Sequence, residues 1–222
     1  MKISSETLNI LKNFSTINHS IVVEEGNVLK SISPMKNIFV RADVVETFPR
    51  KFAIYELTEF LGGLSLFKDP DFDFSDPSYV LIKDGRSKVK YFFSDPSVIT
   101  SAPEKDIELP SIEVKFDLST DTLNALQRAA GVYQLPDLSL VGDGAQMQLV
   151  VRDNKNDSSN NYCIDVGETS ATFNFNFKVE NIKILPGDYT VSMCSKGISL
   201  FENTSLNLKY WIALEPNSQY KS

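Results

Sequence analysis

The chain has 222 residues, of which 42% are hydrophobic and 23% charged, and its 22 basic and 29 acidic side chains give a formal net charge of −7. This is the composition of a globular protein with one large domain or two ordinary ones, and its acidity argues against diffuse nucleic-acid binding while leaving room for a locally basic surface. No apolar run could cross a bilayer, and the N-terminal residues lack the features of a signal peptide. Cys163 and Cys194 fit no metal-ligand spacing, so we expect a cytoplasmic protein without a membrane partner or a metal.

Residues 4–14, SSETLNILKNF, predict an amphipathic helix. Its apolar side chains recur at spacings of three to five residues and would line one side: Ile3, Leu8, Leu11, Phe14 and Ile17. The opposite side is polar: Asn9, Lys12, Asn13 and Thr16. Ser4 suits the N-cap position, and Glu6 suits the positive end of the helix dipole. Beyond this first turn the polar side carries no acid.

The rest of the first half predicts short antiparallel strands and one further helix. Apolar and polar residues alternate within 20–32, 37–45 and 78–93, with turns at EEGN and KDGR. KFAIYELTEFLGGLSLF, residues 51–67, begins as a strand and continues as a short apolar helix. SDPSVITSAPEKDIELPS, residues 94–111, has three prolines and no periodicity, which indicates an extended linker.

The second half begins with an altered copy of the first helix, STDTLNALQRA at residues 119–129. Five of its eleven positions are identical to SSETLNILKNF, including the N-cap serine, here Ser119. The sequence places Leu123, Leu126 and Ala130 inward and Asn124, Gln127 and Arg128 outward. As in the first copy, the acid, here Asp121, lies in the first turn.

Two further landmarks recur in the same order. FNFNFKVENIKILPG, residues 173–187, is again a strand that leads into a short apolar helix, with hairpin turns expected at GDGA before it and SKG after it. VKYFFSDP closes the first half and LKYWIALEP, residues 208–216, closes the second. These repeats indicate a duplicated domain, with an N-terminal domain at 1–96, a connector at 97–112 and a C-terminal domain at 113–222.

The opening MKISSETLNILKNFSTIN, the segment AIYELTEFLGGLSL, the phrase LPGDYTV and the closing strand resemble the DNA polymerase sliding clamps of T-even bacteriophages. LKYWIALEP is also similar to the C-terminal strand of the proliferating cell nuclear antigen. The resemblance spans essentially the whole chain and rests on the order and spacing of these motifs. It implies an α+β fold of two similar DNA-clamp domains, each with two short helices packed on antiparallel sheet, assembled as a ring.

The resemblance implies a processivity factor without enzymatic activity or cofactor, in which three subunits join head-to-tail around duplex DNA. Three chains would carry a charge of about −21, so only the bore would attract DNA, weakly and without sequence preference. The side chains expected to face DNA are those on the polar sides of the repeated helices, Asn9, Lys12, Asn13, Asn124, Gln127 and Arg128, with Lys2, Lys178 and Lys183 in addition. The implied partners are the replicative DNA polymerase, a clamp loader and, in T-even phages, late-transcription factors, all in the host cytoplasm.

Two protein-binding surfaces follow from the same resemblance. A pocket for short partner peptides is expected near the connector and the closing strand, from Val98, Ile99, Ile107, Pro186, Trp211, Ala213, Leu214 and Pro216. Trp211 and Leu214 are equally compatible with inward packing in an ordinary strand. The subunit interface is expected at two edge strands, from Val89, Tyr91 and Phe93 on one side and Tyr162, Ile164 and Val166 on the other.

Other chemistry is poorly supported. His19 is the only histidine and has no neighbouring activated nucleophile. DPDFDFSD, residues 69–76, lacks the Gly and Glu of a calcium loop and predicts a strand with Phe72 and Phe74 buried. Two alternatives stay open: a tandem hot-dog enzyme such as a thioesterase, whose helices would be apolar nearly all round, and a phage interaction protein without a DNA role.

Overall fold

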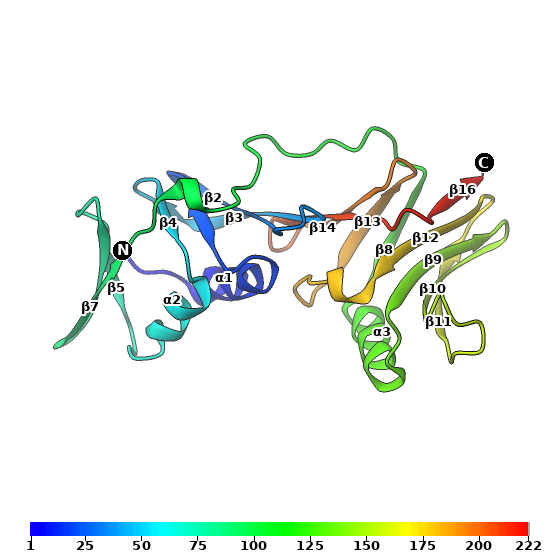
Figure 1. Cartoon of the computed structure of the whole chain (residues 1–222), viewed down its shortest axis with the longest axis horizontal. Coiled ribbons are helices and arrows are strands. Elements are labelled where there is room, and N and C mark those ends of the chain that lie inside the picture. Colours follow the sequence, from blue (N-terminus) through cyan, green and yellow to red (C-terminus); the bar gives the residue numbers. More distant parts are fainter. Residues whose placement is uncertain (222) are drawn as a thin grey trace. The chain divides into compact units, whose positions relative to one another are not determined.

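The computed structural model describes residues 1–221 and divides the chain into two compact units, unit 1 and unit 2 (Figure 1). Unit 1 comprises residues 1–105 and 206–208. Unit 2 comprises residues 106–205 and the chain from Lys209 onward. Both combine α-helix with antiparallel strands, so the fold is α+β, as the sequence predicts.

Unit 1 contains two helices and seven strands. The helices are α1 (Ser5–Ile17) and α2 (Leu57–Leu64), and a 3₁₀ turn, η1 (Pro96–Val98), follows the last strand. The strands are β1 (Ile21–Val23), β2 (Gly26–Ile32), β3 (Ile38–Phe48), β4 (Phe52–Ile54), β5 (Asp71–Asp73), β6 (Tyr79–Asp84) and β7 (Ser87–Phe92). β2 pairs with β3, β1 with β4, and β5, β6 and β7 form a three-stranded sheet in that order.

The turn expected at EEGN does not close a hairpin. β1 pairs with β4, so the chain changes partner between Val23 and Gly26. Gly26 has a φ of +116°, a conformation that side chains disfavour, and it allows this change of direction. The turns at KDGR, GDGA and SKG do join paired strands, as predicted.

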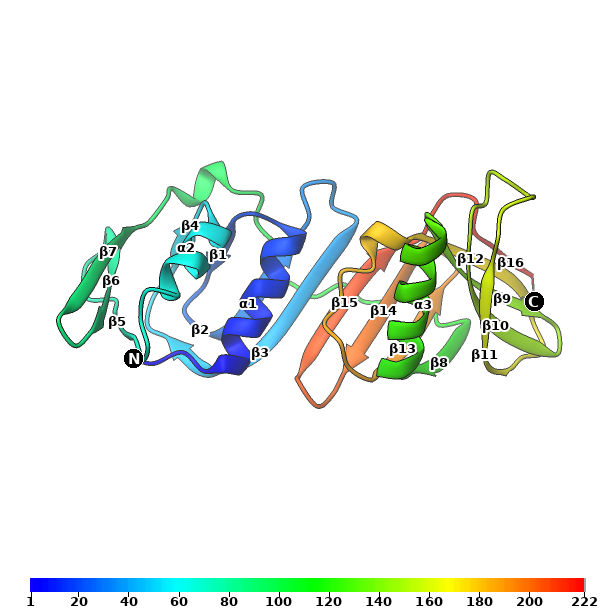
Figure 2. The ribbon, with the colours of Figure 1, turned by 90° about the horizontal axis from the view of Figure 1, so that it is seen from below.

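The core of unit 1 lies between its strands and helices. In α1 the buried residues are Thr7, Ile10, Leu11, Phe14 and Ile17. The buried stripe is thus rotated from the predicted one, because Ile3 and Leu8 are only half-buried. α1 packs on β2, β3 and α2, and Figure 2 shows it lying across these strands. Phe72 and Phe74 are buried as predicted, and Phe74 joins a ring cluster with Phe48 and Phe52.

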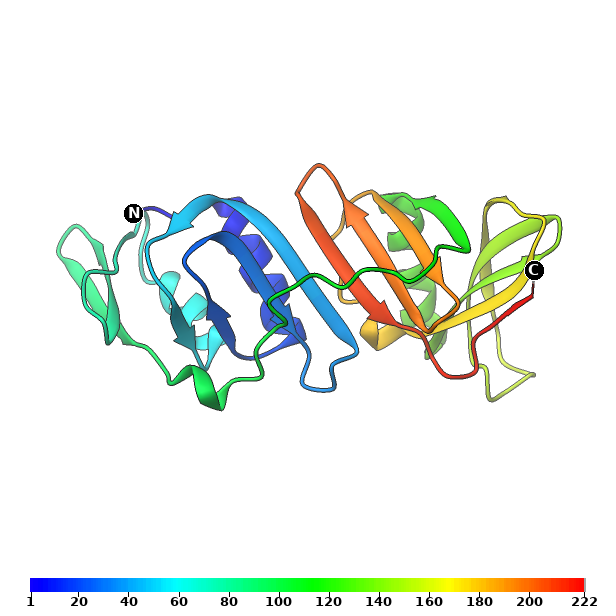
Figure 3. The same cartoon turned by 90° about the horizontal axis from the view of Figure 1, so that it is seen from above.

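Up to residue 221, unit 2 contains one helix, α3 (Thr120–Tyr133), and nine strands. The strands are β8 (Val114–Leu118), β9 (Asp137–Asp143), β10 (Gln146–Arg152), β11 (Tyr162–Glu168), β12 (Thr172–Lys178), β13 (Tyr189–Cys194), β14 (Ile198–Asn203), β15 (Leu208–Ala213) and β16 (Gln219–Lys221). One sheet has the order β11-β10-β9-β12-β16, and a second series runs β15-β14-β13-β8 (Figure 3). α3 packs on β10 and β11 and buries Leu123, Leu126 and Ala130, as predicted.

The second helix expected in the second half is absent from unit 2 as described. After β12 the chain makes only a 3₁₀ turn, η2 (Val179–Asn181), before an irregular segment leads to β13. Between the strand end at Lys178 and Pro186 only seven residues remain, and Pro186 cannot extend a helix. The apolar residues Ile182 and Ile184 are nevertheless buried. The apolar pattern in this segment therefore reflects residues that pack in the core, although they form no helix.

Within residues 1–221, no helix combines the length and apolarity needed to span a bilayer. The same residues hold no cluster of three or more His, Cys, Asp or Glu side chains placed to bind a metal ion. Both cysteines are free thiols, with Cys163 exposed and Cys194 buried.

Candidate functional site

The first turn of α1 is fastened by side chains from its own cap and from β3. The Ser4 hydroxyl accepts a hydrogen bond from the Thr7 amide at 3.2 Å, which confirms the predicted N-cap. The Glu46 carboxylate, buried on β3, accepts hydrogen bonds from the Ser4 amide and the Thr7 hydroxyl. Burial alone would raise the pKa of Glu46, but these hydrogen bonds lower it overall.

The first turn of α3 repeats this arrangement. The Ser119 hydroxyl accepts from the Thr122 amide at 3.2 Å. A second acid, Asp188, accepts from the amide and hydroxyl of Thr120 at 2.7 and 3.0 Å, and the Thr120 amide holds the pKa of Asp188 below its usual value. In both helices an acid outside the helix therefore fixes the N-terminal turn and with it the orientation of the polar side.

The polar sides of α1 and α3 are exposed and free of acids beyond their first turns. The exposed side chains include Asn9 and Lys12 on α1 and Gln127 and Arg128 on α3, whereas Asn13 and Asn124 are half-buried. Among residues 1–221, neither Lys12 nor Arg128 forms an ion pair. Each helix thus offers one uncompensated cation among neutral hydrogen-bonding groups, a surface suited to weak contact with phosphates.

Lys2 and Lys178, which were also expected to face DNA, are already paired. Lys2 forms an ion pair with Asp69, and both side chains are exposed. Lys178 pairs with Asp137, whose side chain is only 2% exposed, and this hydrogen bond raises the pKa of Lys178. Because Lys178 compensates a buried carboxylate, we revise its expected role from a DNA contact to a structural one. Lys183 is exposed in the segment after η2.

The strands expected at the subunit interface are both sheet edges. β7 is the last strand of β5-β6-β7, and β11 is the first strand of β11-β10-β9-β12-β16. Val89 and Tyr162 are exposed, and Tyr91, Ile164 and Val166 are half-buried. Phe93 lies just beyond β7, and its ring stacks on Phe52 at 5.1 Å between centroids, so it is less available than predicted. An unpaired edge exposes backbone groups that another strand can satisfy.

The residues expected to form a peptide pocket divide into two groups. Val98, Pro186 and Pro216 are exposed, and Ile107 and Ala213 are half-buried. Ile99, Trp211 and Leu214 are buried, with 7%, 3% and 8% of their surface exposed. These three side chains pack inward and do not present a surface to a peptide, which corrects the expectation for them.

The segment that follows β15 is held by a network that the sequence did not indicate. The Glu215 amide donates to the Asn176 carbonyl at 2.8 Å, and the Asn176 amide donates to the Ser218 hydroxyl at 2.9 Å. The Asn176 side chain is buried and accepts from the Ser139 hydroxyl at 2.7 Å. Beside this network lies a cavity of about 270 Å³, lined by Asp137, Asn154, Lys155, Lys178, Glu215, Pro216 and Asn217.

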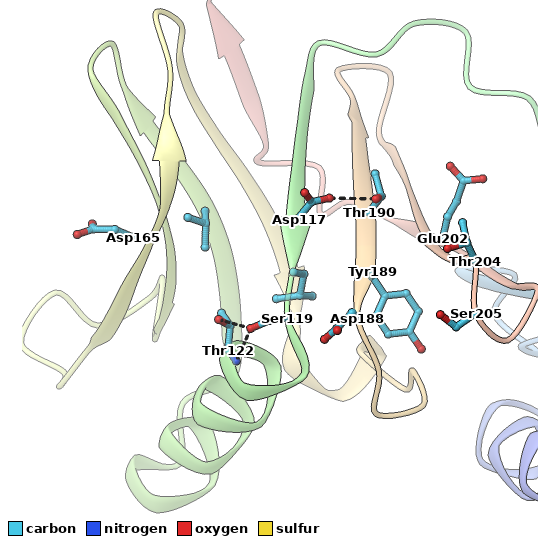
Figure 4. Close-up of a pocket in the computed structure, with 12 residues that line it drawn as sticks. Asp117, Ser119, Thr122, Asp165, Asp188, Tyr189, Thr190, Glu202, Thr204 and Ser205 are labelled. Carbon is cyan, nitrogen blue, oxygen red and sulfur yellow. Dashed lines mark hydrogen bonds between the residues drawn. The ribbon is translucent and has the colours of Figure 1, made fainter.

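A larger cavity of about 390 Å³ lies in unit 2 near the start of α3 (Figure 4). Its walls carry acids and hydroxyls from β8, α3, β11, β13 and β14, among them Ser119, Thr122 and Asp165. Asp117 accepts a hydrogen bond from Thr190 at 3.0 Å across β8 and β13, and Asp188 is bound to Thr120. These acids are satisfied within the fold, and the cavity offers no nucleophile with an adjacent base.

Comparisons with known proteins agree with this geometry. The family model of the DNA polymerase processivity factor matches residues 4–101, and that of the gp45 sliding clamp, C terminal, matches residues 115–216. The sliding clamp of Vibrio phage KVP40 is 32% identical, with 97% of this chain and 99% of that protein covered. The sliding clamp of Enterobacteria phage T4 is 28% identical, with 99% of each covered. Among solved structures, A. fulgidus PCNA bound to the C-terminal region of FEN-1 matches with a TM-score of 0.71 at 14% identity over 98% of each chain.

Proposed function

Because the chain belongs to the family of sliding clamps, the processivity factors of DNA polymerases, we propose that three copies close into a ring that encircles duplex DNA and tethers the replicative polymerase. The polar sides of α1 and α3 would face the DNA. The observation that carries this proposal is the exposed, acid-free side of both repeated helices, each with one uncompensated cation, Lys12 or Arg128. In a chain of net charge −7, a surface that contacts phosphates has to lack acidic side chains. In both helices the acidic residue lies in the first turn.

The small number of cations fits a surface that slides. Each phosphate neutralised by a Lys or Arg releases counterions and strengthens binding, so many such contacts would hold a ring in place. Asn9, Gln127 and the half-buried Asn13 and Asn124 add neutral hydrogen-bonding groups that exchange readily between phosphates and water. Lys183 is a further exposed cation for the same role.

The ring would close through the two free edges. β7 of one copy would add to the β11 edge of the next, which extends one sheet into the other and satisfies the backbone groups of both. Because β7 belongs to unit 1 and β11 to unit 2, the contact joins different surfaces and can repeat head-to-tail.

Each unit keeps exposed apolar residues of the predicted pocket that a partner peptide could contact. Val98 is 61% exposed in η1, and Pro186 and Pro216 are exposed in unit 2. We propose the polymerase and a clamp loader as partners that insert an apolar anchor at Val98 of unit 1, with late-transcription factors as a further class in phage-infected cells. The site of action would be the host cytoplasm.

The alternatives fit less well. A tandem hot-dog enzyme needs a helix that is apolar nearly all round, whereas α1 and α3 each expose a polar side. The relatives are named sliding clamps over nearly their whole length, which does not favour an interaction protein without a DNA role.

Topology tests the proposal directly. The protein is loaded by its loader on nicked circular DNA, and the bound fraction is measured before and after the circle is cut at one site. An encircling ring should slide off the ends of the linear DNA and stay on the uncut circle. Equal retention on both would refute encirclement. Blocking the two ends with bound protein should restore retention and serves as the control.

A further inference from the structure

The edge strands β7 and β11 carry opposite charges. The β6–β7 hairpin and β7 expose Arg86, Lys88 and Lys90, and residues 85–93 contain no acid. β11 carries Asp165 and Glu168 and no base. The two edges therefore carry charges of opposite sign.

On β7 the two lysines lie on one face together with the exposed Phe92, and Val89 and Tyr91 lie on the other. The Tyr91 ring packs on Phe60 of α2 at 5.0 Å between centroids, and its hydroxyl donates to the Glu56 carbonyl at 3.2 Å. Tyr91 and Val89 therefore lie on the helix side, because side chains two apart share a face. Lys88 and Lys90 lie on the other face, where the Lys90 ammonium stands 4.5 Å from the centre of the Tyr79 ring.

β11 has the same division. Ile164 pairs with Leu149, which is buried on the side that α3 covers, so Ile164 and Tyr162 lie on the helix side. Asp165 lies on the opposite face, where it accepts a hydrogen bond from the Gln148 amide group at 2.6 Å. Gln148 is neutral, and among residues 1–221 neither Asp165 nor Lys88 has an ion-pair partner.

On the basis of the proposed ring, we infer that β7 of one copy pairs antiparallel with β11 of the next in the register that sets Lys88 opposite Asp165. The same register sets Val89 opposite Ile164 and Tyr91 opposite Tyr162. Directly opposed opposite charges, and directly opposed apolar or aromatic side chains, stabilise a strand pair.

Other pairings lose part of this match. A shift by one residue would place lysines against the apolar face of β11. A shift by two that set Lys90 opposite Asp165 would draw Lys90 away from Tyr79 and leave Lys88 opposite Gly167. A parallel arrangement with Lys88 beside Asp165 would set Tyr91 beside Glu168. A shift by two in the other direction would set Arg86 opposite Asp165 but leave Tyr91 beyond the end of β11. The inferred register pairs Lys88 with Asp165 and keeps both Val89 and Tyr91 on the apolar face of β11.

The inferred contact predicts a salt-sensitive joint. Exposed ion pairs weaken as ionic strength rises. Reversing one charge, Lys88→Glu, should weaken each joint about fivefold or more at low salt. The double variant Lys88→Glu with Asp165→Lys should recover most of that loss, because the opposite charges are restored with their places exchanged.

Cysteine cross-linking tests the register itself. In the inferred register Lys90 lies opposite the exposed native thiol of Cys163, and Cα atoms in such positions are about 4.5–5.5 Å apart, within the range of a disulfide. Mild oxidation of the full-length Lys90→Cys variant should therefore give covalent trimers on a denaturing gel. Phe92→Cys tests the register shifted by two, and Lys83→Cys on the interior strand β6 is the exposed control.

The outcomes separate the register from the ring. Covalent trimers from Lys90→Cys, with little product from Phe92→Cys or Lys83→Cys and none after Cys163→Ser, support the inference. Cross-linking of Phe92→Cys in preference to Lys90→Cys, in a protein that is a trimer by native mass, overturns the register and leaves the ring standing. A native mass of one chain overturns the ring and the register with it.

Discussion

The Glu46 carboxylate on β3 accepts a hydrogen bond from the hydroxyl of Thr7 in the first turn of α1. Through this contact and the one to the Ser4 amide, a strand of the sheet sets the angle of the helix whose other side is proposed to face DNA. Thr7 and Ser4 have counterparts in Thr122 and Ser119 of the second copy, and Asp188 supplies the acid there. The two copies therefore share the helix and also the hydrogen bonds from its first turn to an acid outside the helix.

Loss of the Glu46 charge should destabilise unit 1. We expect Glu46→Gln to lower the free energy of unfolding by about 1–3 kcal/mol at pH 7, because charge-assisted hydrogen bonds to buried donors are lost. The pKa of Glu46 is lowered in the folded protein, so its contribution is complete above the ordinary value of 4.5 and is lost as the pH falls through the folded pKa. Urea unfolding of both proteins from pH 7 to pH 3 should show the difference shrink toward acid. A difference that stayed constant over that range would contradict the assignment.

Charge reversal on the helices should impair DNA contact and leave assembly intact. Lys12→Glu with Arg128→Glu should reduce loading and processive synthesis, since two acids would enter the otherwise acid-free surface. The defect relative to the parent protein should diminish as added salt screens the field. Primer extension on a long template, with native mass as the second readout, measures both. Lys36→Glu, in an exposed turn of unit 1, makes the same type of charge change away from the helices and should have little effect.

Removal of the Lys178 charge should affect stability and not DNA binding. Lys178→Met leaves the buried Asp137 without its cation, and we expect a loss of about 1–3 kcal/mol in the free energy of unfolding. Loading per folded trimer should stay near that of the parent protein. A loading defect without loss of stability would return Lys178 to the set of DNA contacts.

Polymerase binding should depend on Val98, an exposed apolar residue of η1. Val98→Asp places a charge on an exposed position, so the protein should remain folded while its affinity for the polymerase falls by about tenfold or more, the effect of losing an apolar anchor. Binding is measured by titration with the polymerase, and folding by thermal unfolding. Met35→Asp, at a more exposed apolar position in another turn, is the control. If both variants bind alike, Val98 is outside the peptide site.

Local pattern was enough to predict the elements that depend on nearby residues. The period of α1 and α3, their serine caps and the alternation at Phe72 and Phe74 all reflect interactions within a few residues of sequence. The repeat added the two-part organisation. The family resemblance supplied what the residues alone did not, namely the expectation of a ring.

The features that sequence reasoning missed depend on long-range contacts. η2 takes the place of a helix because Ile182 and Ile184 find burial without one. The pairing of Lys178 with Asp137 joins residues 41 apart, and Asn176 holds the chain end over a similar span. Trp211 is buried, but the alternation of residues in its strand does not show which face of the strand is buried. Which distant residues are buried or paired depends on the order of the strands in the sheet, and this order could not be predicted from the sequence.

The irregularity in β11 limits how long a joint between subunits can be. The register with β10 shifts between Met147 and Gln148, opposite Asp165 and Gly167, so the regular ladder of β11 ends at Asp165. Only about four residues of β11 then offer a straight edge to another strand, and each backbone hydrogen bond contributes about 0.5–1.5 kcal/mol net. A contact this short can break at one place while both strands keep their partners within their own sheets. We therefore expect a ring to open and reclose at one subunit contact while its domains stay folded. The lifetime of the ring on DNA would then depend on the strength of that short contact and not on the stability of the domains.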